Sequence, residues 1–317
     1  MTRRDRFYNG VLLLNKPTGI TSHDAVLKIR REIHQRRVGH TGTLDLRAEG
    51  LMVMCLGRAT KIAQFVCDFD KVYEAELCLG RRSKTYDAEG IFGNQMPMKV
   101  PDMTDEEAQN LLDEYKGIIQ QQVPAYSAVR VDGQRLHELA REGIEVDPPI
   151  REVEIKEIQL VSYRNPYLSF RTNCSKGTYV RSLANDIGNR LGCGAYLSKL
   201  RRISVGSLTL DRAITLNEVN RCHENGTLEK HLLSVDKVLH YSAVKVTEAF
   251  RQEIISGPEL APEHVVTIEG DFSAGDKVML KDARGTVLAV GKAEAGADRF
   301  RAGEDGEKLF SYIRVLN

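Results

Sequence analysis

Two kinds of apolar spacing alternate along most of this 317-residue chain, and together they predict both strands and helices. Continuous or alternating apolar runs are typical of strands, whereas apolar residues three and four positions apart are typical of amphipathic helices. The runs that predict strands are Val11–Leu14, Gly50–Gly57, Val72–Leu79, Glu152–Tyr163 and Tyr167–Cys174. Tyr73 falls on the apolar face of its strand, so a core tyrosine is its simplest interpretation.

Helical spacing follows several of these strands. Apolar residues at positions 25, 26, 29 and 33 predict a helix that Ser22 caps, and the rest of its circumference is mostly basic. Further helices are predicted at 60–68, at 105–115, at 136–143 and at 180–191. The basic face of the first helix, which holds Arg30 and Arg31, is most simply a solvated surface. Its place just before a loop of small residues adds support for a phosphate role.

From about Tyr241 the pattern changes to short strands and turns. The stretch 244–255 predicts a helix, and the runs 265–268, 277–280 and 286–293 predict strands with a hairpin turn at 282–285. We therefore predict two domains, a large α+β domain over residues 1–240 and a small β-rich domain over residues 241–317. The chain is long enough to form two such cores.

Composition places the chain among ordinary globular proteins. Apolar residues make up 42% and charged residues 28%, and the formal net charge of +1 gives no global signal for nucleic acid. No apolar run approaches the ~20 residues that cross a bilayer, and the N-terminus lacks the apolar core of a signal peptide. The six cysteines are scattered singly, which predicts neither a zinc site nor disulfides, so a reduced, cytoplasmic protein is expected.

A loop of small residues, Gly39-His40-Thr41-Gly42-Thr43-Leu44-Asp45, holds the first candidate chemistry. Its glycines and threonines let backbone approach a ligand, and Asp45 is its only acid. An ordinary turn before a buried strand explains these residues equally well. A second candidate is the segment 175–183, where a lysine, a glycine and Arg181 lie at a strand-to-helix junction suited to pairing with an anion. Taken alone, Arg181 is more simply a surface arginine.

Five motifs occur together and in a fixed order along the chain. They are Leu14-Asn15-Lys16-Pro17-Thr18-Gly19, the Gly39–Asp45 loop, Gly57-Arg58-Ala59-Thr60-Lys61, Lys71-Val72-Tyr73 and Lys176-Gly177-Thr178-Tyr179-Val180-Arg181. As a set they resemble the bacterial tRNA pseudouridine-55 synthases, the TruB family, over about residues 10–205. The tail resembles a PUA-type RNA-binding domain. The resemblance implies a pseudouridine synthase fold, with a large, mostly antiparallel mixed sheet, flanking helices and an RNA cleft.

The resemblance also implies an activity, the isomerisation of uridine 55 in the T loop of tRNA to pseudouridine. The chemistry breaks the N1–C1′ glycosidic bond, turns the uracil and joins C5 to C1′, so neither a cofactor nor a metal is expected. The implied partner is the T arm of tRNA, which the excursion at about 124–150 would clamp. No membrane and no obligate protein partner are implied, and a monomer is expected.

Carried over to this chain, the resemblance assigns roles to seven residues. Asp45 matches the catalytic aspartate, which could add covalently, stabilise an oxocarbenium sugar or take a proton from C2′, and the sequence leaves these routes open. Tyr73 matches the tyrosine that stacks on the base and is a candidate for C5 proton removal. Arg181 matches the arginine that keeps the aspartate ionised and oriented. The other four are expected to bind substrate or support the site: His40 in the space of the flipped nucleotide, Tyr179 in the pocket wall, and Lys16 and Lys61 in structure or RNA contact.

One departure from the family pattern lies next to the aspartate. The family has Asp-Pro, whereas this chain has Asp45-Leu46-Arg47, which leaves the backbone after Asp45 freer. Two other functions would use the same surface, a non-catalytic tRNA-binding or folding chaperone and a guide-RNA-dependent synthase in a ribonucleoprotein. The intact Asp45, Tyr73 and Arg181 favour an enzyme over the first, and the excursion favours stand-alone action over the second.

Overall fold

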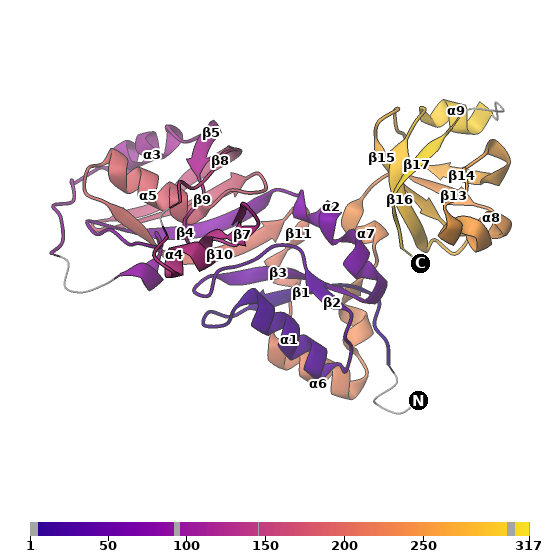
Figure 1. Ribbon diagram of the computed structural model, residues 1–317, viewed down its shortest axis with the longest axis horizontal. Helices are drawn as coiled ribbons and strands as arrows, with labels where there is room; N and C mark the ends of the chain where they lie inside the picture. The colour runs from indigo at the N-terminus through magenta and orange to yellow at the C-terminus, as the bar shows by residue number, and fades with distance from the viewer. Residues whose placement is uncertain (1–5, 92–95, 145, 303–307, 317) are drawn as a thin grey trace.

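The protein folds around two β-sheets, a large one with flanking helices and a small one at the C-terminus (Figure 1). The computed structural model describes residues 6–91, 96–144, 146–302 and 308–316. The α+β class that the family resemblance implies is confirmed, and so is the β-rich nature of the tail.

Ten strands form the large sheet, and in the described chain their ladders are antiparallel except that of β10 with β3. Eight of them follow one another in the order β12 (Leu232–Leu233), β1 (Gly10–Lys16), β3 (Glu49–Leu56), β10 (Ala195–Val205), β4 (Lys71–Leu79), β9 (Tyr167–Cys174), β8 (Ile150–Arg164) and β5 (Gly117–Gln122). The remaining two are β2 (Val38–His40), on β3, and β11 (Leu208–Thr209), on β10. A separate hairpin consists of β6 (Arg130–Val131) and β7 (Gln134–Arg135).

The central strand β10 is among the strands that the apolar pattern does not predict. Lys199, Arg201 and Arg202 interrupt its apolar residues and indicate a basic surface cluster instead. In the structure Arg201 is exposed and Arg202 is buried, because neighbouring side chains of a strand point to opposite faces. Gly50 of β3 has φ +100°, and a Cβ there would collide with the carbonyl oxygen of Arg202, so glycine lets β3 approach β10.

The main core lies between one face of the large sheet and four helices. These are α1 (Ser22–Glu32), α3 (Asp105–Asp113), α5 (Val180–Arg190) and α6 (Leu216–Asn225). Because side chains alternate along a strand, Leu12 and Leu14 of β1 enter this core, while Val11 and Leu13 enter a second core on the opposite face. The second core includes residues of α2 (Ala63–Cys67) and α7 (Asp236–Leu239), and α4 (Leu136–Arg141) lies in the excursion after β5.

Two sequence predictions about helices need correction. Ser22 does not cap α1; Thr21 does, because its side chain accepts from the N–H of Asp24 while the Asp24 carboxylate accepts from the N–H of Thr21. The segment predicted as one helix over 60–68 is a 3₁₀ turn, η2 (Gly57–Ile62), that continues into α2.

The C-terminal sheet has five strands in the order β14 (Val265–Glu269), β13 (Ala243–Val246), β15 (Lys277–Lys281), β16 (Val287–Ala293) and β17 (Phe310–Val315). Two short helices, α8 (Glu248–Glu253) and α9 (Ala297–Ala302), accompany it. The helix predicted over 244–255 is wrong in its first part, which is β13; the chain becomes helical only after Thr247, whose side chain caps α8. The predicted hairpin turn is confirmed, because the N–H of Asp282 donates to the carbonyl of Thr286.

One hydrophobic cluster joins the two sheets. Met279, Val290 and Leu316 from the C-terminal part pack in the same cluster as Val11 and Leu13 of β1. In Figure 1, α7 lies in the region where the chain passes from the large sheet to the small one. Because the core is shared, the domain division at residues 240 and 241 remains a proposal.

Candidate catalytic pocket

A pocket of about 310 Å³ opens beside Asp45. Its walls come from five separate segments of the chain, which the large sheet brings together. The lining includes the charged and aromatic residues Asp45, Lys71, Tyr73, Tyr179, Arg181 and Arg202, together with Thr41–Leu44, Cys67 and Ala128. Asp45, Tyr73, Tyr179 and Arg181, which the sequence proposed as site residues, therefore lie in one cavity.

Backbone and side-chain hydrogen bonds hold the loop that carries Asp45. The Ser22 hydroxyl accepts from the N–H of Leu44 at 2.8 Å and donates to its carbonyl at 2.9 Å. The N–H of Gly19 donates to the carbonyl of Leu46 at 2.9 Å, and the N–H of Ala48 donates to that of Asp45 at 3.1 Å. The start of α1 and the turn at Gly19 thus anchor the loop, which is held without the proline of the family pattern.

Arg181 lies between two carboxylates. Its Nε is 3.5 Å from Oδ2 of Asp45, and its Nη1 is 3.8 Å from Oδ2 of Asp87. The side chain of Asp45 is 40% exposed, whereas those of Arg181 and Asp87 are 7% and 8% exposed. Among the described residues, Nε of Arg181 finds no hydrogen-bond partner, so the contact with Asp45 is a charge contact without hydrogen-bond geometry.

Asp87 is a site residue that sequence reasoning missed. It belongs to a polar segment, 81–94, that is expected to be a plain loop, and residues 92–94 lie outside the described part of the chain. The Asp87 carboxylate accepts from the Thr85 hydroxyl and, at 2.9 Å, from the N–H of Glu89. No spacing along the chain points to its pairing with Arg181, because the two residues meet only through the folded sheet.

Tyr73 lies on β4 with its ring in the pocket lining and is almost fully buried. Burial raises the pKa of the Tyr73 phenol, and the nearby charge of Arg202 opposes that rise. The hydroxyl is therefore neutral at pH 7. A neutral aromatic ring in a pocket is suited to stacking against a planar base.

Two buried cationic side chains, which sequence reasoning did not place at the site, also line the pocket. Arg202 donates from Nε to the carbonyl of Leu51 at 2.7 Å and from Nη2 to that of Gly42 at 3.1 Å, so it links β3 to the loop that carries Asp45. Lys71 donates from Nζ to the carbonyl of Cys67 at 2.6 Å. Burial lowers the pKa of the Lys71 ammonium, and the charge of Arg202 lowers it further.

Tyr179 and His40 lie at the edges of this arrangement. Tyr179 lines the pocket as the residue before α5, and the Arg181 guanidinium carbon lies 5.6 Å from the centre of its ring. His40 ends β2 beside the lining residues Thr41 and Gly42, and its Nδ1 accepts from the N–H of Gly42 at 3.3 Å. Burial, followed by the charge of Arg202, lowers the pKa of the His40 imidazole, which is therefore neutral at pH 7.

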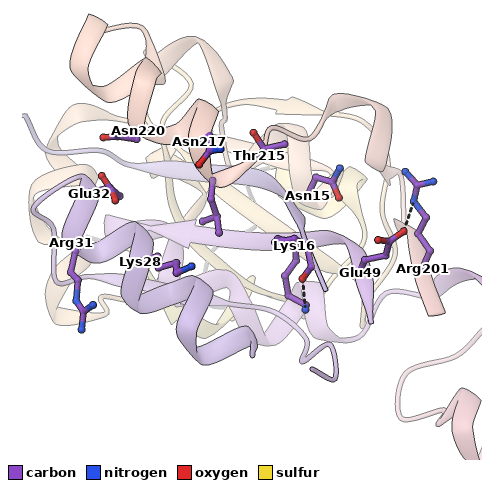
Figure 2. Close-up of a pocket in the computed structure, with 12 residues that line it drawn as sticks. Asn15, Lys16, Lys28, Arg31, Glu32, Glu49, Arg201, Thr215, Asn217 and Asn220 are labelled. Atoms are coloured by element: carbon purple, nitrogen blue, oxygen red, sulfur yellow. Dashed lines mark hydrogen bonds and ion pairs between the residues drawn. The ribbon is translucent and has the colours of Figure 1, made fainter. Parts of the chain in front are cut away.

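Lys16 and Lys61 lie outside this pocket. Lys16 lines a larger groove of about 790 Å³ between α1 and α6, where Lys28 of α1 and Asn217 of α6 also lie (Figure 2). It is fully buried and donates to the carbonyls of Pro17 and Ile20, and burial lowers its pKa to about 8. Lys61 lies on η2, where burial and the charges of three arginines, Arg37, Arg314 and Arg58, lower its pKa.

Two further searches concern only the described residues. None of their helices is both long and apolar enough to span a membrane. Nor do their histidine, cysteine and acidic side chains form a group of three or more that is placed to hold a metal ion.

The arrangement of the two sheets matches solved structures. The chain is similar to one in a crystal structure of a Cbf5-Nop10-Gar1 complex, with a TM-score of 0.75 and 24% identity over 97% of this chain and 85% of that one. A second match is a chain of a Nop10-Cbf5 complex from the archaeal box H/ACA sRNP, with a TM-score of 0.73 and 21% identity, covering 99% and 90% of the two chains. The fold is that of a pseudouridine synthase with an attached PUA-type domain, as predicted.

Sequence comparison identifies the family. Family models match residues 30–180 (TruB family pseudouridylate synthase, N-terminal domain), 181–240 (tRNA pseudouridylate synthase B C-terminal domain) and 243–308 (PUA domain). The chain is 39% identical over 289 residues to tRNA pseudouridine synthase B of Bacillus pumilus, covering 89% of this chain and 92% of that protein. The protein of the same name from Clostridium kluyveri is 40% identical over 258 residues, 80% and 86% of the two chains. This chain belongs to the TruB family of pseudouridylate synthases.

Proposed function

We propose that this protein isomerises uridine 55 in the T loop of tRNA to pseudouridine, with Asp45 as the catalytic group. The observation that carries the proposal is the cavity in which Asp45 lies 3.5 Å from Arg181 and shares the lining with Tyr73. The name of the relatives, tRNA pseudouridine synthase B, supports tRNA as the substrate. The reaction breaks the N1–C1′ bond and forms the C5–C1′ bond; C5 loses a proton and N1 gains one, so no oxidant or second substrate is consumed.

Asp45 is the accessible carboxylate of the cavity, and its exposure supports direct contact with the sugar of the flipped nucleotide. Addition to C1′ and removal of a proton from C2′ both need a carboxylate at this place. Arg181 orients Asp45. Tyr73 stacks on the uracil. Its neutral phenol supports this role better than removal of the C5 proton, which needs a base.

The remaining site residues surround the flipped nucleotide. Tyr179 forms a wall of the base pocket. His40 enters the space that the flipped nucleotide leaves in the RNA stack, and because its imidazole is neutral, it does so without burying a charge. Lys16 is structural, because its ammonium is buried against two backbone carbonyls. Lys61 contacts RNA from the cationic surface of η2.

The same proposal covers the organisation of the molecule. Residues 1–240 form the catalytic domain and 241–317 an RNA-binding domain, and the excursion at 124–150, of which residue 145 lies outside the described chain, clamps the T arm. Ala128 of this excursion lines the cavity, which supports a clamp that closes over the substrate. The enzyme acts as a cytoplasmic monomer without an obligate protein partner.

Asp45→Asn tests the catalytic assignment. An unmodified tRNA transcript is incubated with each protein, pseudouridine is mapped chemically, and tRNA binding is measured in parallel. We expect the wild type to modify uridine 55 and Asp45→Asn to form no product while its Kd for tRNA stays within about threefold, because the substitution removes the charge and keeps the shape. Asp70→Asn is the matched control, since Asp70 pairs with Lys156 and does not line the cavity.

Three other results would contradict this assignment in different ways. Normal product from Asp45→Asn would remove Asp45 from the chemistry. Product at another uridine would overturn the substrate. A wild type that binds and refolds tRNA without forming pseudouridine would leave the chaperone as the function of this surface.

A further inference from the structure

Gln121 is a buried polar residue on a strand that is otherwise largely accessible. β5 is the last strand of the large sheet, beside β8, and lies close to α5 in Figure 1. On this strand Ile118 is 69% exposed, whereas Gln121 is 2% exposed. Burying a carboxamide while an isoleucine stays in water runs against the hydrophobic effect, so apolar packing does not explain this position.

The carboxamide of Gln121 holds the beginning of α5. Its Oε1 accepts a 2.7 Å hydrogen bond from the N–H of Tyr179, the residue that precedes the helix. Tyr179 makes no side-chain cap, so the helix start takes an acceptor from β5 instead. A second hydrogen bond joins β5 to α5 at the residue after Gln121, because the Ser182 hydroxyl donates to the carbonyl of Gln122 at 2.9 Å.

The other half of the Gln121 carboxamide is unsatisfied. Within the described chain, Nε2 of Gln121 is buried and has no hydrogen-bond partner. A buried donor without an acceptor destabilises the folded protein. Stability of the fold therefore does not explain a glutamine at this position. The atom that makes a contact is the side-chain oxygen, which holds the N–H of Tyr179.

Gln121 also lies at the root of the excursion. The N–H of Val123 donates to the carbonyl of Pro149 at 3.0 Å, so the excursion leaves and rejoins the sheet directly beyond Gln122. The side chain of Gln121 is hydrogen-bonded to the N–H of Tyr179. Tyr179 lines the cavity together with Arg181, which lies in the first turn of α5. A short chain of contacts thus connects the excursion with the residues around Asp45.

We propose that Gln121 is a positioning residue that sets Tyr179 and Arg181 for the reaction and connects them to the excursion. The proposal rests on the function proposed above and deepens it. Gln121 touches no reacting atom; it acts through the backbone of Tyr179. Its loss therefore lowers the rate of the chemical step more than the affinity for RNA.

Three variants test the role of the Gln121 oxygen. Gln121→Met keeps the length of the side chain and removes the acceptor, Gln121→Glu keeps an acceptor, and Gln120→Met makes the same change at the exposed neighbouring position. We expect Gln121→Met to lower kcat about tenfold, the effect of one lost hydrogen bond on the transition state, with KM for a tRNA transcript within about twofold. Gln121→Glu should recover kcat to within about threefold of the wild type. Gln120→Met should have the kcat of the wild type.

The outcomes separate this proposal from the one on which it rests. A folded Gln121→Met with wild-type kcat overturns the positioning role, and so does a Gln121→Glu that loses as much rate as Gln121→Met. If Gln121→Met does not fold, Gln121→Glu decides alone, with wild-type kcat in support and a tenfold loss against. A wild type and a Gln120→Met that both form no pseudouridine overturn the proposed function itself.

Discussion

At the scale of single residues, Arg181 separates two carboxylates that differ in access. Asp87 is buried with the guanidinium, whereas Asp45 is partly exposed to the cavity. A buried guanidinium needs a compensating charge, and Asp87 supplies one from a buried position. In the proposed reaction, Asp45 can therefore change its bonding while Asp87 balances the charge of Arg181.

Lys16 offers a test of burial through pH. Its folded-state pKa of about 8 is below the ordinary value of 10.5, because burial disfavours the charged form. Between these two values the unfolded chain binds more protons than the folded one, so this residue makes the free energy of unfolding rise with pH. The gain is up to about 3 kcal/mol, since one pKa unit corresponds to about 1.4 kcal/mol.

Urea unfolding of the wild type and Lys16→Met at pH 7 and pH 10 measures this effect. Other groups that titrate in this range are common to both proteins and cancel in the difference. We expect the wild type to gain stability relative to Lys16→Met as the pH rises. An unchanged difference between the two proteins would mean that Lys16 keeps an ordinary pKa in the folded state.

At the scale of elements, the loop after Asp45 is a turn that lacks its usual proline. The bond from the N–H of Ala48 to the carbonyl of Asp45 makes Leu46 and Arg47 the central residues of a four-residue turn. Proline is favoured at the first central position of common turns and disfavoured at the second. The proline of the family pattern Asp-Pro would stand at the first of these positions, and this chain forms its turn without that covalent restraint.

Leu46→Pro should therefore stabilise the protein. We expect the free energy of unfolding to rise by about 0.5–1 kcal/mol, because proline restricts the unfolded chain, with pseudouridine formation within about twofold of the wild type. Arg47→Pro, one residue further along, is the matched control and should destabilise. Urea unfolding measures both changes, and a Leu46→Pro variant that loses stability would show that this turn differs from the one described.

At the scale of the whole molecule, the C-terminal sheet is packed on the large sheet rather than tethered beside it. The shared cluster buries Met279 and Leu316 together with Val11 and Leu13. An exposed ion network adds to this interface: Asp68 lies 2.7 Å from Nζ of Lys176, near the cavity, and 3.7 Å from Nζ of Lys277 on β15. Exposed pairs contribute little, so the apolar cluster is the main connection.

Neighbouring residues of β15 allow the shared core to be tested. Met279 packs in the shared cluster, and Leu280 packs only in the core of the C-terminal sheet. We expect Met279→Ala and Leu280→Ala each to cost about 2–4 kcal/mol, the usual effect of such a buried deletion. Only Met279→Ala should also speed hydrogen exchange at the amides of β1. Equal exchange at β1 in both variants would mean that the two sheets open independently.

Much of the site could be predicted because its residues lie in local motifs. Asp45, Tyr73, Tyr179 and Arg181 stand in short segments whose order matches the family, and all four line one cavity. Asp87 and Gln121 could not be found in this way. Each acts through a single contact with a residue far along the chain, and neither has neighbours that mark it.

The amino-acid sequence by itself determined the elements whose spacing is regular, the family and the loop that carries Asp45, because apolar periodicity and local motifs are properties of consecutive residues. Only the tertiary structure decided which side chains share the cavity, that β10 with its buried Arg202 is central, and that the two sheets share a core. These features depend on pairings between strands distant in sequence. The energy of such pairings comes from burial and hydrogen bonds that form only once the chain has folded.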